Sequence, residues 1–272
     1  MKNLIIRTIT GIAFVALVVA SVLISELFLF NVLLFFACIG MYEYRTLLQQ
    51  NNVKLSVIFY VIGLLIYFIV SYVSLWEALG ATFVFMLVFA LLFVAFIVEL
   101  FRVQEQAFQT IAYFVLGIIW IMLPFALINR LPLLLSEGQF LLLSVFVIIW
   151  LYDTFAYCVG MLIGKHRLFE RISPKKSWEG AIGSTLLTLI LAYFANLLFP
   201  MLPLTPFQWI GLAIVTIVFG TLGDLIESLF KRQLSVKDSG TILPGHGGIL
   251  DRFDSILFAV PFVWIYLHII LK

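Results

Sequence analysis

Long apolar runs separated by short polar segments make up most of the chain. A helix needs roughly 20 mainly apolar residues to cross a bilayer. Nine runs approach that length, and they cover residues 9–24, 27–41, 55–75, 78–100, 110–128, 140–164, 178–202, 209–230 and 249–271. Only the short stretch "SELF", residues 25–28, marks the junction of the first two runs, which form either a tight helical hairpin or one bent, partly interfacial element. The pattern predicts an all-α polytopic membrane protein with about nine transmembrane helices.

Composition supports the same class of protein. Of the 272 residues, 64% are hydrophobic and 11% are charged, whereas soluble domains are nearer half apolar and a quarter charged. Cys38 and Cys158 both lie inside apolar runs, so we expect them to pack as small hydrophobic residues rather than to form a metal or disulfide framework. The N-terminal run is expected to be a first span, not a cleavable signal peptide.

The basic residues predict the orientation of these spans. With nine spans, fourteen of the sixteen Lys and Arg residues fall on the side that holds the N-terminus, the loops after even-numbered spans and the start of span nine, and only Arg130 and Lys272 fall on the other side. Cytoplasmic loops carry an excess of Lys and Arg. We therefore expect a cytoplasmic N-terminus and a C-terminus on the opposite side.

Polar residues are distributed unevenly along the chain. Spans one to five carry few of them, and spans six to nine carry most. We interpret residues 1–136 as a transmembrane scaffold and residues 137–272 as the catalytic region of one integrated membrane domain.

Two groups of acidic residues lie near ends of the last two spans. Asp224, Glu227 and Lys231 share one helix face, with Gly220 and Gly223 one turn earlier, where another backbone or a ligand could approach closely. Asp251 and Asp254 open the last span, where a helix N-terminus favours anions. The alternatives are a solvated Glu227–Lys231 pair and ordinary acidic capping. Carboxylates gathered at one mouth need a cation, and oxygen ligands favour Mg²⁺ over zinc.

A basic segment follows Asp153 in span six. The stretch "SPKKSWEG" resembles a helix start, with Ser173 as N-cap and Pro174 at the first helical position. That start would direct Lys175, Lys176 and Ser177 toward phosphates. The alternative is a positive-inside loop that attracts anionic lipid.

The glycine-rich stretch "GTILPGHGG" connects spans eight and nine. It matches neither a Walker A loop nor a dinucleotide-binding fingerprint. His246 stands between glycines, so we expect it to donate to a phosphate or to move a proton. Carboxylates for one or two divalent cations, basic residues and close-approaching glycines together indicate phosphoryl or nucleotidyl transfer at a membrane surface.

Residues 228–254, "SLFKRQLSVKDSGTILPGHGGILDRFD", resemble the signature of the phosphatidate cytidylyltransferases (CDP-diacylglycerol synthases) at every fixed position. The stretch "SPKKSWEG" and Asp153 resemble the polar segment that lies upstream of it in that family. The resemblance implies a homodimeric, multi-pass enzyme of the bacterial cell membrane, with its active site facing the cytoplasm. It would convert CTP and phosphatidic acid to CDP-diacylglycerol and pyrophosphate with Mg²⁺, and would have no nucleic-acid partner.

The resemblance also implies roles for individual residues. Asp224 and Asp251 would be catalytic metal ligands, with Asp254 as a third. The residues expected on the phosphate side are Lys237 and His246, in catalytic roles, and Lys175, Lys176, Ser177, Lys231, Arg232 and Arg252, in substrate binding.

Two other functions use similar residues. A CTP-dependent lipid-alcohol kinase needs a base to activate its alcohol, which His246 could supply, and it is distinguished by its products. A secondary transporter would carry inverted repeats and polar residues near the bilayer midplane in both halves. The sequence shows neither feature.

Overall fold

A computed structural model describes residues 2–102 and 106–271. These residues form two compact units. The first contains the chain up to Arg130 together with Asp238–Asp251, and the second contains Leu131–Lys237 and Arg252–Lys272. Lys272, one of the two basic residues predicted on the far side, lies outside the described residues. The predicted division after residue 136 is functional, and packing does not test it.

The first unit is built from α1 (Lys2–Ile24), α2 (Glu26–Gln50), α3 (Val57–Ser71), α4 (Val73–Leu79), α5 (Ala81–Leu100), α6 (Ala107–Gly117) and α7 (Leu123–Arg130). Ser25 accepts the N–H of Phe28 and thereby starts α2 as a separate helix that packs against α1. The first two runs therefore form two packed helices, which agrees with the hairpin, one of the two predicted alternatives. A π-helical turn, Ile118–Met122, joins α6 to α7 just before Pro124, which has no N–H to donate.

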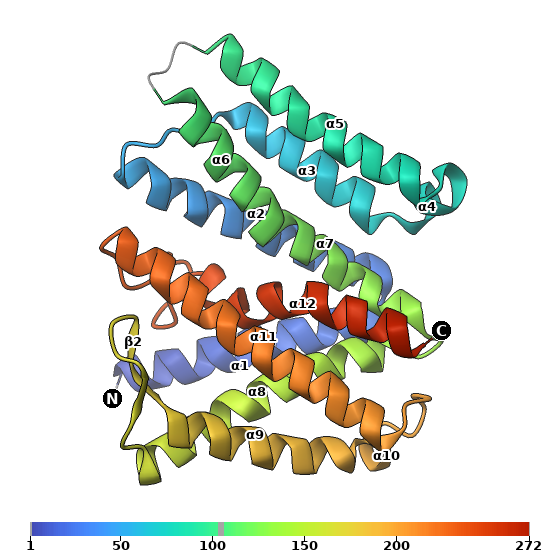
Figure 1. The fold of residues 1–272 in the computed structure, drawn as a ribbon, viewed down its shortest axis with the longest axis vertical. Coiled ribbons are helices and arrows are strands. Elements are labelled where there is room, and N and C mark those ends of the chain that lie inside the picture. Colours follow the sequence, from blue (N-terminus) through green and yellow to red (C-terminus); the bar gives the residue numbers. More distant parts are fainter. Residues whose placement is uncertain (1, 103–105, 272) are drawn as a thin grey trace. The chain divides into compact units, whose positions relative to one another are not determined.

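Aromatic side chains fill the core of this unit. Phe59 of α3 stacks on Phe114 of α6 with ring centroids 4.3 Å apart, and both rings are fully buried. Gly117 admits Met41 and Tyr44 of α2, because a Cβ there would lie 3.0–3.2 Å from their side chains. Helices α3 and α5 lie side by side (Figure 1).

The second unit contains a short 3-10 turn (Leu131–Leu134) and then α8 (Gly138–Ile163), β1 (Arg167–Phe169), β2 (Ser173–Ser177), α9 (Trp178–Tyr193), α10 (Ala195–Leu198) and α11 (Pro206–Gln233). Helix α12 (Leu250–Ile270) begins in the first unit and continues in the second. Glycines let α8 and α9 lie against one another (Figure 1). A Cβ on Gly180 would come 3.0 Å from Ala156 O, and one on Gly183 would come 2.7 Å from Val159.

A capping box begins α11, and a glycine allows its close contact with α12. Thr205 and Gln208 form a capping box, with Pro206 in the first turn of the helix. Farther along, Gly223 allows α11 to approach α12, because a Cβ would lie 2.5 Å from Phe258 and 2.6 Å from the carbonyl oxygen of Asp254. The prediction that Gly223 permits close backbone approach is confirmed.

The chain is an all-α polytopic membrane protein, as predicted. Helical structure occurs at all nine predicted positions. In the described part of the chain, seven helices are long and apolar enough to cross a membrane, while α3 has 15 residues and α9 has 16. The count of about nine spans and the orientation of the termini stay predictions. Exposed aromatic residues such as Phe85, Phe89 and Phe93 on α5 suit contact with lipid.

The predicted helix start at Ser173 is wrong. Residues Ser173–Ser177 form β2, which pairs antiparallel with β1, and α9 begins only at Trp178. Ser177 is the actual N-cap, since its hydroxyl accepts the N–H of Gly180 at 3.2 Å. A proline after a serine fits an edge strand as well as a first helical turn, and pairing with β1 selects the strand.

Candidate functional site

A pocket of about 200 Å³ lies between α8 and the β ribbon in the second unit. Asp153, Lys175, Lys176 and Ser177 all line it, together with apolar side chains of α8 and α9. Ser177 is 5% exposed because it lies at the packed start of α9. The pocket therefore gathers the polar residues that the sequence singled out in residues 152–180.

Lys176 connects this pocket to α11. Its ammonium forms an ion pair with Asp224 Oδ2, and Ser228 Oγ donates to Asp224 Oδ1 at 3.3 Å. A cavity of about 10 Å³, lined by Asp153, Lys176 and Ser255 among others, adjoins them, and such a space holds about one water molecule. By sequence, Lys175–Lys176 and Asp224 fall into separate groups. In the structure, they belong to one cluster.

The next turn of α11 carries a buried ion pair. Lys231 Nζ donates to Glu227 Oε2 at 2.7 Å, and the two residues are 9% and 2% exposed. This is the i,i+4 pair that the sequence offered as an alternative, but it is buried rather than solvated. Lys231 would have to leave Glu227 to reach a phosphate. Asp254 Oδ1 accepts the N–H of Ser255 at 2.6 Å in the early part of α12.

The glycine-rich loop, residues 238–249, forms a second cluster in the first unit. Asp251 Oδ2 accepts three hydrogen bonds, from Ser239 N at 2.9 Å, Ser239 Oγ at 3.1 Å and Gly248 N at 2.7 Å. Gly247 has φ +82, and a Cβ there would lie 2.5 Å from Asp251 Oδ2. Only glycine adopts this conformation readily, so the loop can close tightly on the carboxylate.

Helix α1 also contacts the loop. His246 Nδ1 lies 2.8 Å from Thr10 Oγ1, and Gly245, with φ +77, lies against the side chain of Arg7. His246 is half-buried. Its predicted role toward a phosphate or a proton is not tested by these contacts.

Glu43 was not identified from the sequence. It lies on α2, within the predicted scaffold, and its carboxylate accepts hydrogen bonds from residues 239, 249 and 250. An acidic residue at the end of an apolar run was the one available signal, and a solvated helix end explains that signal equally well. The partners lie about 200 residues away in sequence, so only the fold reveals them.

The remaining basic candidates lie at the surface. Lys237, Arg232 and Arg252 are exposed. Arg232 is oriented by backbone carbonyls, with Nε 3.5 Å from Ile172 O and Nη1 3.3 Å from Val236 O. These side chains have the charge and the access to meet a soluble polyphosphate.

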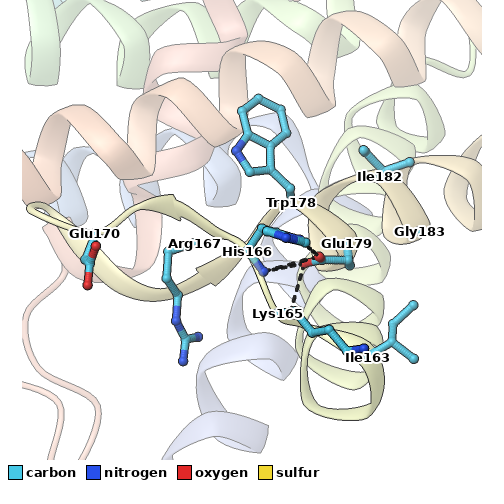
Figure 2. Close-up of a pocket in the computed structure, with 9 residues that line it drawn as sticks. All are labelled: Ile163, Lys165, His166, Arg167, Glu170, Trp178, Glu179, Ile182 and Gly183. Carbon is cyan, nitrogen blue, oxygen red and sulfur yellow. Dashed lines mark hydrogen bonds and ion pairs between the residues drawn. The ribbon is translucent and has the colours of Figure 1, made fainter.

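An open depression of about 980 Å³ lies beside the β ribbon (Figure 2). Glu179, in the first turn of α9, accepts the N–H groups of Lys165 and His166 at 3.1 Å, and lies 2.5 Å from His166 Nδ1. These bonds fix the turn that leads from α8 into β1. Arg167 projects away from this pair in the view shown.

The donor chemistry suits a hard divalent cation. Asp224, Asp251 and Asp254 offer carboxylate oxygens, and the position of Lys176 shows that Asp224 already stabilises a positive charge. Within the described residues, no three His, Cys, Asp or Glu side chains form a recognisable metal cluster. The metal assignment therefore rests on the residue types and on the resemblance.

The fold and these clusters define a multi-pass membrane protein with paired acidic and basic groups suited to phosphate chemistry. The model of the cytidylyltransferase family matches residues 5–270, and the chain belongs to that family.

Named relatives agree with this assignment. A Bacillus subtilis (strain 168) phosphatidate cytidylyltransferase is 35% identical over 267 residues, which are 96% of each chain. Enzymes with the same name from Staphylococcus aureus (strain COL) and Staphylococcus haemolyticus are 49% and 48% identical over 132 residues. Those 132 residues are 48% of this chain and 50% of each of the two relatives, so the chain matches about half the length of these Staphylococcus proteins.

Proposed function

We propose that this protein transfers the CMP moiety of CTP to phosphatidic acid, giving CDP-diacylglycerol and pyrophosphate for phospholipid synthesis. The observation that carries the proposal is the match to the cytidylyltransferase family across residues 5–270. The Lys176–Asp224 cluster supports it with chemistry suited to a polyphosphate substrate.

The reaction forms one bond and breaks one. An oxygen of the phosphatidate phosphate attacks the α-phosphorus of CTP, and the bond from that phosphorus to the β-phosphate oxygen breaks to release pyrophosphate. The attacking oxygen is already an anion, so it needs no strong general base. The main barrier is repulsion between two anionic substrates, which positioned positive charge lowers.

The residues divide into two roles. Asp224, Asp251 and Asp254 would hold one or two Mg²⁺ ions, which when bound neutralise charge between the two phosphate groups. Lys175 and Lys176 would donate to the departing pyrophosphate. Arg232, Lys237, Arg252 and His246 would hold substrate phosphates from the exposed loops, while Ser177 shapes the pocket by capping α9.

The setting follows from the same assignment. We infer a multi-pass protein of the bacterial cell membrane, with the cluster facing the cytoplasm where CTP is found, and a homodimeric assembly. Exposed apolar residues flank the pocket, among them Tyr157 at 66% exposure. Diacyl chains could therefore stay in lipid while the phosphate enters.

Incubation of the purified protein with phosphatidic acid, CTP and Mg²⁺ tests the proposal. We expect CDP-diacylglycerol and pyrophosphate in equal amounts. In a parallel incubation with a lipid alcohol in place of phosphatidic acid, formation of a phosphorylated lipid and CDP would instead identify a kinase.

A further inference from the structure

Glu43 is a buried carboxylate that caps α12 from another helix. It lies on α2 and is 3% exposed. Its Oε1 accepts the N–H of Ile249 at 2.9 Å, and its Oε2 accepts the N–H of Leu250 at 3.0 Å. The first N–H groups of a helix have no partner within the helix and favour an anion. Glu43 supplies the acceptor oxygens at the start of α12.

The same carboxylate reaches the hydrogen bonds around Asp251. Ser239 Oγ lies 3.0 Å from Glu43 Oε2 and 3.1 Å from Asp251 Oδ2, so this hydroxyl stands between the two acids. Gly248 donates its N–H to Asp251, and a Cβ on Gly248 would lie 2.4 Å from Glu43 Oε2. Glu43 and Asp251 therefore hold the two ends of the glycine-rich loop in one arrangement.

Fold stability alone does not require a buried glutamate from another helix here. A serine or aspartate at the N-cap would satisfy the same N–H groups locally. A carboxylate placed 206 residues away from Ile249 instead ties the loop geometry to α2.

We propose that Glu43 is a positioning residue, which orients Asp251 for the reaction through Ser239 and the first turn of α12. This inference rests on the proposed function. Groups that orient metal-binding side chains typically change activity or metal affinity by about 10- to 100-fold when removed. The predicted scaffold would then contribute directly to the geometry of the catalytic loop.

Glu43→Gln tests the inference, with Glu99→Gln as the matched control. Glu99 is also a buried glutamate of the first unit, 2% exposed, but its bond goes to Arg102. Glutamine at position 43 has one carbonyl oxygen where glutamate has two carboxyl oxygens. At least one of the groups that donate to Glu43, which belong to residues 239, 249 and 250, would then lose its acceptor. We expect kcat of Glu43→Gln to fall by about 10- to 100-fold with little change in the KM for phosphatidate, and kcat of Glu99→Gln to stay near that of the native protein.

Hydrogen exchange provides a second readout that needs neither metal nor substrate. In detergent without Mg²⁺ or CTP, peptides covering residues 238–250 should exchange faster in Glu43→Gln than in the native protein, and Glu99→Gln should leave them unchanged. Should Glu43→Gln not fold, Ser239→Ala removes the shared hydroxyl without altering α2 and is expected to lower kcat in the same direction.

The outcomes separate this inference from the proposed function. Faster exchange together with a lower kcat supports it. For Glu43→Gln, either unchanged exchange or faster exchange with a native kcat overturns the inference. If Glu43→Gln does not fold, a native kcat in Ser239→Ala overturns the inference instead. If the native protein makes no CDP-diacylglycerol, the proposed function fails, and with it the catalytic role of Glu43, while the exchange data still decide whether Glu43 orders the loop.

Discussion

Two single residues, Lys176 and Asp224, connect β2 to α11 in the candidate cluster. They lie 48 positions apart, on β2 and α11, and they form a direct ion pair. Asp224 also accepts a hydrogen bond from Ser228. Under the proposed function, Asp224 would hold a metal ion in place of the Lys176 ammonium, and Lys176 would then donate to a phosphate oxygen.

We expect turnover to depend on the carboxylates of Asp224 and Asp251. Asp224→Asn and Asp251→Asn each keep the size of the side chain while removing one negative charge. We expect each variant to lose about 100-fold or more in kcat, because preorganised charge supplies most of the stabilisation in phosphoryl-type transfer. Assays at saturating Mg²⁺ on detergent-purified protein that elutes like the native one measure the effect. Near-normal turnover of either variant would remove that residue from the metal site.

The residue at which α9 begins depends on strand pairing as well as on the local sequence. The sequence predicts Ser173 as the N-cap, whereas the pairing of β2 with β1 leaves that role to Ser177. Hydropathy could predict where the long helices lie, because they coincide with long apolar stretches of the sequence. It could not predict Glu43, whose partners Ile249 and Leu250 are brought to it by tertiary packing. Asp251 is predicted as a metal ligand from its spacing to Asp254 at a helix start and from the resemblance of residues 228–254, and this role stays a prediction.

Stability measurements distinguish the two serines. Ser177→Ala should destabilise the protein by about 1 kcal/mol, the usual effect of losing an N-cap. Ser173→Ala should change stability by less than about 0.5 kcal/mol, as surface substitutions do. Unfolding in detergent with increasing denaturant gives both values. A larger loss in Ser173→Ala than in Ser177→Ala would favour the helix start that the sequence suggested.

The two compact units of the molecule do not follow the order of the sequence. The loop Asp238–Asp251 belongs with the N-terminal helices. The signature in residues 228–254 could be recognised from sequence, but its division between the two units could not, because that depends on which helices each part contacts. Membrane orientation was predicted from basic residues and is open to direct measurement.

Labelling of single cysteines tests that orientation. In a variant lacking Cys38 and Cys158, we place cysteine at Glu170, in the exposed β1–β2 turn, or at Ser136, exposed between α7 and α8. A membrane-impermeant maleimide added to intact cells should label Ser136→Cys and spare Glu170→Cys until the cells are opened. The reverse pattern would place the Lys176–Asp224 cluster outside the cytoplasm.

The fate of the CTP phosphates tests the proposed CMP transfer most directly. Two parallel reactions with purified protein, phosphatidic acid and Mg²⁺ would use CTP labelled at the α-phosphate or at the γ-phosphate. We expect the α-label to enter the lipid fraction as CDP-diacylglycerol and the γ-label to leave as pyrophosphate. Entry of the γ-label into lipid, with the α-label remaining in soluble CDP, would contradict CMP transfer.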